Sequence, residues 1–85
     1  MIKTIVKIDG MMCGMCESHV NDKIRNSFKV NSVKSSHSKG ESVILTESKL
    51  NEADLRAAIE ETGYKVLSVT SEEYQKKGLF GIFGR

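Results

Sequence analysis

The sequence has 85 residues, of which 39% are apolar and 28% charged, and its net charge at neutral pH is +2. A chain of this length and composition forms one small globular domain with a modest core. Basic residues alternate with acidic ones along the chain and aromatic residues are few, which excludes the clustered basic surface or stacking platform of a nucleic-acid binder.

The apolar segments are too short to span a membrane. Residues 43–45 form one of the longest uninterrupted apolar runs, far short of the roughly 20 residues that a bilayer requires. The N-terminal segment carries Lys3 and Lys7, so it lacks the apolar stretch of a signal peptide. If residue 1 is the natural start, we expect a cytoplasmic protein with reduced thiols.

The first predicted element is a strand over residues 2–8. Its residues alternate in polarity, with Ile5 as the exception, and the face expected to be buried consists of Ile2, Thr4, Val6 and Ile8. Gly10 ends this strand, and a loop with both cysteines follows. From Cys16 onward apolar residues recur every four positions, which predicts a helix with the inner stripe Cys16, Val20, Ile24 and Phe28.

The second half contains a hairpin, a helix and a last strand. Residues 30–36 and 41–47 read as strands joined by the turn 37–40. Asn51 is the expected cap of the second helix, and Gly63 its expected end in a left-handed conformation. The predicted inner face of this helix consists of Leu55, Ala58, Ile59 and Thr62. Residues 64–70 form the last predicted strand.

This order predicts an α+β fold of the ferredoxin-like βαββαβ type, a sandwich of two helices on a four-stranded antiparallel sheet. In that topology the cysteine loop, the turn 37–40 and the Gly63–Tyr64 junction lie at the same end of the sheet. Three segments distant in sequence are therefore expected to meet there.

Cys13 and Cys16 are the only cysteines, and their spacing suits a disulfide switch, a pair of metal ligands or a structural pair. Thiolates are soft donors that select Cu(I), Zn(II) and other thiophilic ions, Cd(II) and Hg(II) included. Two ligands can complete the shell of Cu(I), whereas zinc prefers four. A position at a helix N-terminus favours the thiolate form of Cys16. Cu(I) is therefore the leading expectation.

The segments "GMMCGMC" (10–16) and "AIEETGYKV" (58–66) carry a resemblance. They resemble the heavy-metal-associated domain family, and in particular its bacterial copper chaperones, over about residues 3–70. The sequence "FKVNSV" (28–33) departs from the family, because it lacks the glycine usual after the first helix. The resemblance implies a metal-binding domain at residues 1–70 and delivery of Cu(I) to a metal-transporting P-type ATPase or its N-terminal metal-binding domain by thiolate ligand exchange. No acid–base constellation, phosphate-binding loop or nucleophile–histidine arrangement is found in the sequence, so we expect no enzymatic activity.

The resemblance also implies roles for single residues. Cys13 and Cys16 would bind the metal, Met11 would anchor the loop in the core, and Tyr64 would pack beside the loop and limit solvent access. Met15, and less specifically Met12, could add a weak thioether donor. His19 and His37 are further candidate ligands, and with both cysteines they would make a four-ligand zinc site.

Several alternatives stay open. The chain could be a domain excised from an ATPase, a zinc, cadmium or mercury detoxification domain, or a dithiol–disulfide oxidoreductase. The last is disfavoured because thioredoxin-type folds set a cis-proline against their cysteines and this sequence has no proline. We expect a monomer without metal, with a metal-bridged dimer as an option.

Residues 71–85 fall outside the resemblance. They combine Lys76 and Lys77 with the apolar residues Leu79, Phe80, Ile82 and Phe83. We expect a flexible C-terminal tail or one folded onto the domain, and interfacial membrane contact is the alternative.

Overall fold

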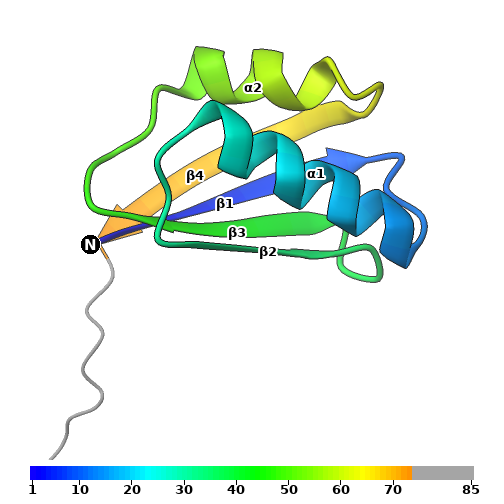
Figure 1. Ribbon diagram of the computed structural model, residues 1–85, viewed down its shortest axis with the longest axis horizontal. Helices are drawn as coiled ribbons and strands as arrows, with labels where there is room; N and C mark the ends of the chain where they lie inside the picture. The colour runs from blue at the N-terminus through cyan, green and yellow to red at the C-terminus, as the bar shows by residue number, and fades with distance from the viewer. Residues whose placement is uncertain (74–85) are drawn as a thin grey trace, which may run out of the picture.

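The computed structural model describes residues 1–73, which form four strands and two helices in the predicted order (Figure 1). The elements are β1 (Ile2–Asp9), α1 (Gly14–Ser27), β2 (Ser32–Ser36), β3 (Glu41–Thr46), α2 (Glu52–Glu60) and β4 (Lys65–Glu73).

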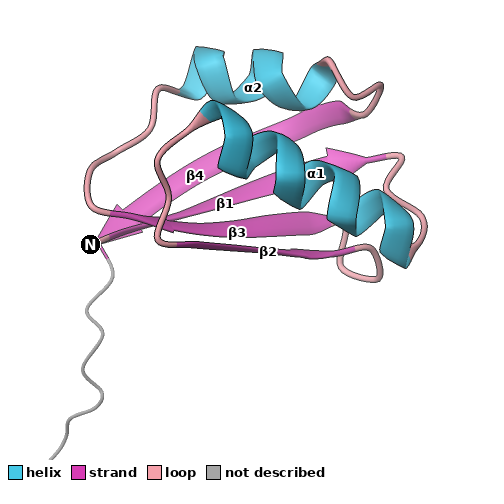
Figure 2. Cartoon of the chain, in the orientation of Figure 1, coloured by secondary structure: helices cyan, strands magenta, loops and turns pink. Residues whose placement is uncertain are grey.

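The four strands form one antiparallel sheet in the order β2-β3-β1-β4. Both helices cover the same face of this sheet, and the other face is open (Figures 1 and 2). The predicted ferredoxin-like sandwich is therefore confirmed. Within residues 1–73, neither helix has the length and apolar character needed to cross a membrane.

The alternation in β1 decides which face of the sheet meets the helices. Thr4, Val6 and Ile8 are buried beneath them. Ile5, the exception to the alternation, lies on the open face, where it is half-buried and opposite Val43 of β3. An apolar residue at this position thus packs against a cross-strand neighbour instead of the core.

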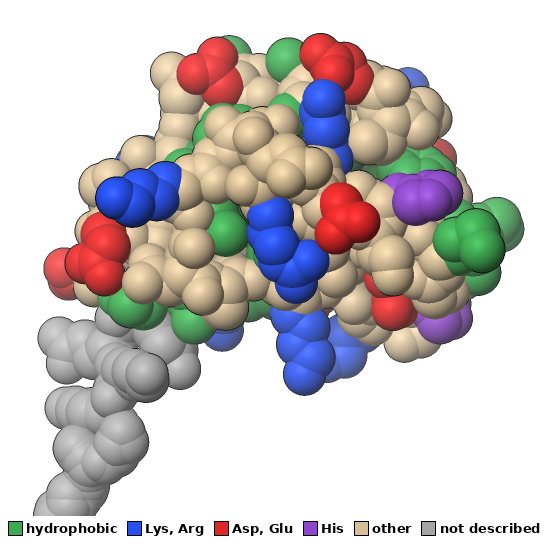
Figure 3. Space-filling model, in the orientation of Figure 1, with side chains coloured by type: hydrophobic (Ala, Val, Ile, Leu, Met, Phe, Trp, Pro, Cys, Tyr) green, Lys and Arg blue, Asp and Glu red, His purple; other side chains and the backbone are tan. Residues whose placement is uncertain are grey.

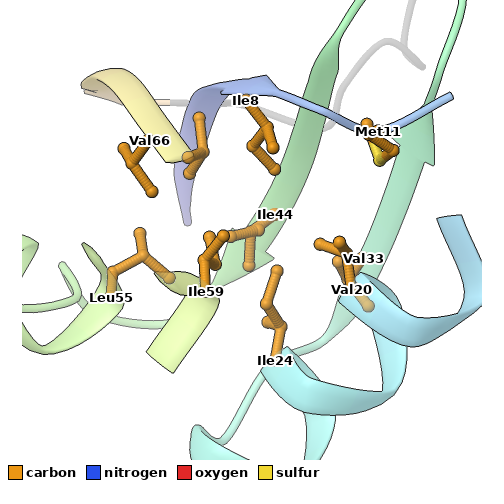
Figure 4. Packing of buried hydrophobic residues seen from close by; sticks show 10 residues of the cluster. Ile8, Met11, Val20, Ile24, Val33, Ile44, Leu55, Ile59 and Val66 are labelled. Atoms are coloured by element: carbon orange, nitrogen blue, oxygen red, sulfur yellow. The ribbon is translucent and has the colours of Figure 1, made fainter. Parts of the chain in front are cut away.

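The core lies between the helices and the sheet (Figure 4). α1 contributes Val20 and Ile24, both fully buried, and half-buried Cys16 and Phe28 pack against the same cluster, so the predicted stripe is confirmed. α2 contributes three of its four predicted residues, Leu55, Ala58 and Ile59. The fourth, Thr62, lies beyond the helix, because α2 ends at Glu60.

Polar side chains on the inner face of the sheet form hydrogen bonds with one another and with α1. Ser35 of β2 donates a hydrogen bond to Asn21 Oδ1 of α1 at 2.7 Å, and its Oγ is 2.6 Å from Ser42 Oγ of β3. In the described part of the chain no buried side-chain nitrogen or oxygen lacks a partner. These serines therefore join helix to sheet without leaving a desolvated polar group.

Both predicted signals that bound α2 are present. The Asn51 side chain accepts a hydrogen bond from the Asp54 amide at 3.0 Å, and Gly63 has a φ of +98°. β4 then continues to Glu73, three residues past the predicted end at residue 70, because Ser71, Glu72 and Glu73 pair with β1. The rest of the predicted tail, residues 74–85, lies outside the described residues, so the structure does not test the prediction that it is flexible.

The sheet has two ends with different contents. The cysteine end comprises the loop 10–13, the turn 37–40 and the junction 61–64, which meet as predicted: the Ile8 amide, for example, donates to the Gly40 carbonyl at 2.8 Å. The far end comprises the connection 47–51 and the last residues of β4, 71–73. Figure 1 shows the start of α1 and the connection from β3 to α2 at these opposite ends.

Candidate metal centre

Both cysteines lie on the first turn of α1. The helix begins at Gly14 with Cys13 as its N-cap residue, two residues before the predicted start at Cys16. The Glu17 amide donates to the Cys13 carbonyl at 3.1 Å, which closes the first turn. Cys13 makes no side-chain capping bond, so the sequence holds no cap of the usual kind to mark this start.

The two sulfur atoms face one another. Cys13 Sγ and Cys16 Sγ are 3.2 Å apart and both thiols are free. Cys13 is exposed, whereas Cys16 is half-buried and packs against the core. One sulfur is thus held by the fold and the other is open to solvent.

This separation suits one shared soft ion after a small adjustment. Thiolates lie about 2.3 Å from zinc, so two sulfurs on opposite sides of one ion are at most about 4.6 Å apart. The pair, now at 3.2 Å, can widen toward that limit if the exposed Cys13 side chain rotates.

The surroundings of Cys16 favour its thiolate form. The pKa of Cys16 is lowered from 9.0 to about 7, first by a hydrogen bond from the Tyr64 hydroxyl and then by hydrogen bonds from the Met12 backbone and the Cys13 side chain. Partial burial acts in the opposite direction. The same contact raises the pKa of Tyr64, because the phenol loses a bond when it ionises beside sulfur. The thiolate is the form that binds metals.

Gly10 makes room for this tyrosine, a role that the sequence analysis missed. Its φ is +103°, a region that favours glycine, and a Cβ built at this position would lie 3.3 Å from Tyr64 Cδ1. The signal was the glycine that follows β1, but its tertiary neighbour directly precedes β4, the strand paired with β1, and lies far away in the sequence. The structure thus places Tyr64 against the cysteine loop, where the resemblance put it, and its control of solvent access remains a prediction.

The three methionines of the loop lie in two environments. Met11 is 4% exposed and belongs to the core cluster beneath the loop (Figure 4). Met12 and Met15 are 78% and 70% exposed. Figure 3 shows hydrophobic side chains, with the histidines near them, gathered where α1 begins. A thioether from Met15 remains a predicted accessory donor.

The side chain of His37 is hydrogen-bonded to a carboxylate and does not form a cluster of metal ligands with the cysteines. Its Nδ1 lies 2.6 Å from Glu17 Oε2, and its backbone amide donates to the same oxygen at 2.7 Å. These bonds lower the pKa of Glu17, with the backbone contribution the larger. Glu17 thereby ties α1 to the turn 37–40. This carboxylate bridge was also missed.

His19 is exposed on α1. Among residues 1–73 no group of three or more histidine, cysteine, aspartate or glutamate side chains is arranged to hold a metal ion. The predicted four-ligand zinc site of both cysteines and both histidines is therefore not assembled in this structure.

No protein-family model matches the sequence, and no curated protein matches it either. Solved structures do match. The structure described as "CopZ metallochaperone" is 30% identical, with a TM-score of 0.70 over 76% of this chain and 98% of that one.

Two further structures are 22% identical and share the fold. A copper-binding domain from HMA7, a P-type ATPase, has a TM-score of 0.69 over 81% of this chain and 97% of that one. Oxidized MerP from Ralstonia metallidurans CH34 has a TM-score of 0.68 over the same 81% and 97%. All three proteins align with this chain over almost their entire length.

Proposed function

Because this chain belongs to the heavy-metal-associated domain family, we propose that it binds one soft metal ion between Cys13 and Cys16 and that this ion is Cu(I). The observation that carries the proposal is the pair of free sulfur atoms 3.2 Å apart on the first turn of α1. The low pKa of Cys16, about 7, supports it, because a ligand that is already ionised releases fewer protons on binding metal.

The number of ligands favours Cu(I) over Zn(II). Two thiolates can complete the coordination of Cu(I), while structural zinc sites have four ligands. No third histidine, cysteine or carboxylate joins the cysteines in a cluster within the described range 1–73. Zn(II), Cd(II) and Hg(II) are the competing ions, since all of them are thiophilic.

We further propose that the protein is a cytoplasmic metallochaperone and not an enzyme. Exposed Cys13 lets the cysteines of a partner attack the ion, so the metal moves through three-coordinate intermediates and is never without ligands. A high affinity is then compatible with fast transfer. The partner is a metal-transporting P-type ATPase or its N-terminal metal-binding domain, a proposal supported by the fold shared with a copper-binding domain of such an ATPase.

Partner docking is expected to be transient and electrostatic. The protein is a monomer without metal, and a metal-bridged dimer can form on loading because Cys13 is exposed. The same openness suits a domain excised from an ATPase. Nucleic acid is not an expected partner, since the net charge of the chain is only +2.

A second candidate function is dithiol–disulfide exchange. The separation of the sulfurs and the lowered pKa of Cys16 would both favour a redox-active pair. This activity predicts that the metal-free protein catalyses the reduction of insulin. A protein that only binds metal would not do so.

The proposal is tested by an anaerobic Cu(I) titration against a chromophoric competitor, with Cys13→Ser and Cys16→Ser in parallel. We expect one Cu(I) bound per chain and loss of competition in both variants. A matched titration with Zn(II) should show much weaker binding. Undiminished one-to-one binding of Cu(I) in either serine variant contradicts the two-thiolate site. Tighter binding of Zn(II) than of Cu(I) would mean that the protein binds zinc instead of copper.

A further inference from the structure

The turn that joins β2 to β3 contacts the chain on both sides of the cysteines. The cysteine segment, residues 9–16, is flanked by Ile8 in β1 and Glu17 in α1. The Ile8 amide donates to the Gly40 carbonyl at 2.8 Å. Glu17 accepts hydrogen bonds from His37, at the other end of the same turn. Figure 1 shows this turn beside the start of α1.

The contact on the helix side consists of two hydrogen bonds to one carboxylate oxygen. The backbone amide of His37 donates to Glu17 Oε2 at 2.7 Å, and the ring Nδ1 lies 2.6 Å from the same oxygen. An ionised carboxylate can only accept, so Nδ1 carries the proton of the second bond. Bonds to an ionised acceptor are roughly twice as strong as neutral ones, and the Glu17 side chain is only 26% exposed. This contact therefore holds more firmly than an ion pair on an open surface.

The first turn of α1 depends on such an external contact. Its N-cap residue, Cys13, makes no side-chain capping bond, whereas α2 is capped by Asn51. The first amides of a helix have no partner within the helix, and helix ends fray. In α1 the Glu17 amide bonds to the Cys13 carbonyl at 3.1 Å. The Glu17 side chain thus attaches to the sheet the same turn that carries both cysteines.

The turn between β2 and β3 is itself firmly attached. It joins two strands that pair up to Ser36 and Glu41, the residues on either side of it. The Lys39 amide donates to Ser36 Oγ at 3.3 Å. The Gly40 backbone lies so close to β1 that a Cβ built there would be 3.3 Å from the Ile8 carbonyl oxygen. The turn therefore provides a fixed point from which the helix can be held.

We propose that Glu17 and His37 are positioning residues for the metal centre. With the bond between Ile8 and Gly40 they form a clamp that fixes both ends of the cysteine segment. The clamp limits the motion of Cys16 relative to the other cysteine, so both sulfurs stay within reach of one ion and release it slowly. Groups that orient metal ligands in this way affect metal binding without touching the metal. The inference rests on the function proposed above, because it concerns the release of Cu(I).

A direct role for His37 as a third metal ligand is less well supported. Among residues 1–73, no histidine, cysteine or carboxylate completes a group of three with the cysteines. The ring already uses Nδ1 for the carboxylate, so only Nε2 would remain for a metal. The two roles make different predictions for His37→Asn, because the asparagine amide can donate in place of Nδ1 and has no counterpart of Nε2.

Hydrogen exchange of the metal-free protein tests the clamp itself. In His37→Ala, which loses the ring bond and keeps the backbone bond, we expect the Glu17 amide to exchange about three- to tenfold faster than in the wild type. The amides of residues 24–27, in the last turn of α1, should exchange at unchanged rates, since a general loss of stability would affect both ends of the helix. His37→Asn should restore slow exchange at Glu17.

Release of Cu(I) tests the effect on the metal centre. The loaded proteins are mixed anaerobically with an excess of bathocuproine disulfonate, and the absorbance of the copper complex gives the rate. His37→Ala should release Cu(I) faster than the wild type by a similar factor, and His37→Asn should release it at close to the wild-type rate. Lys39→Ala is the matched control, because Lys39 is exposed in the same turn and its side chain does not belong to the clamp. It should release Cu(I) at the wild-type rate.

The proposal is overturned if His37→Ala shows either the exchange rate or the release rate of the wild type. It is also overturned if His37→Asn releases Cu(I) as fast as His37→Ala, since Nε2 would then be the group that retains the metal. Failure of the wild type to bind Cu(I) would instead remove the metallochaperone proposal, while the exchange measurement would still show whether the clamp holds the first turn of α1.

Discussion

At the scale of single residues, the chemistry of this protein depends on the neighbours of Cys16. The Tyr64 hydroxyl contributes most to the lowered pKa of this thiol, followed by the Met12 backbone and the Cys13 side chain. Each of these groups interacts more strongly with a thiolate than with a thiol, because the thiolate is charged. The fold therefore favours the thiolate form of Cys16, while Cys13 remains exposed to solvent.

Replacement of Tyr64 with phenylalanine should raise the pKa of Cys16 from about 7 toward 9.0, because the largest stabilising contact of the thiolate is removed while the ring remains. Thiolate absorbance as a function of pH measures this shift in the metal-free protein. An unchanged titration midpoint would show that the hydroxyl does not act on the sulfur.

The same shift predicts how stability depends on pH. The pKa of folded Cys16, about 7, lies below the unfolded value near 9.0, so its contribution to stability is fully present above the unfolded pKa and is lost as the pH falls through about 7. Denaturant unfolding of the metal-free wild type should show this loss. Tyr64→Phe should show a smaller change across the same window, whatever its absolute stability.

At the scale of elements, the junction of β1 and α1 positions the site. Gly10 adopts a positive φ and allows Tyr64 to approach the loop, and Gly14 begins the helix between the two cysteines. Only one of these two positions needs a residue without a side chain. A Cβ at Gly14 would meet no atom within 4 Å, whereas a Cβ at Gly10 would lie 3.3 Å from the Tyr64 ring.

Gly10→Ala should destabilise the protein by about 1–3 kcal/mol, the usual cost of an unfavourable backbone conformation, and should disturb the ring of Tyr64. Gly14→Ala is the matched control. It should be neutral or stabilising by up to about 1 kcal/mol, since alanine is the better helix former and nothing blocks its methyl group. Denaturant unfolding of both variants provides the comparison, and equal destabilisation would contradict the distinction.

At the scale of the whole molecule, one core holds the two helices against the sheet and thereby brings the ends of three segments to the cysteines. Ile24 of α1 belongs to this core and is fully buried (Figure 4). The described domain is small, so its total stability is expected to be only about 4–11 kcal/mol. The loss of one core side chain therefore matters to the site even though it is remote from the sulfurs.

Ile24→Ala should lower the free energy of unfolding by about 2–5 kcal/mol through lost burial and the cavity left behind. Leu67→Ala, at an exposed position, should change it by less than about 0.5 kcal/mol. Calorimetry or denaturant unfolding measures both. A small effect of Ile24→Ala would mean that α1 can repack over the cavity, and the positions of Cys13 and Cys16 would then be less dependent on the core than we infer.

The sequence by itself determined the order of the elements, the buried faces of β1 and both helices, the Asn51 cap and the turn at Gly63, and it identified Cys13 and Cys16 as the candidate ligands. All of these depend on periodicity, local hydrogen bonding or side-chain chemistry, which can be inferred from residues that are close together in the sequence. Only the tertiary structure decided the start of α1 at Gly14, the approach of Tyr64 to the cysteine loop and the bridge of Glu17 to His37. The physical reason is that polarity patterns specify which side of an element is buried, whereas the partner that it meets is chosen by packing among segments far apart in the chain.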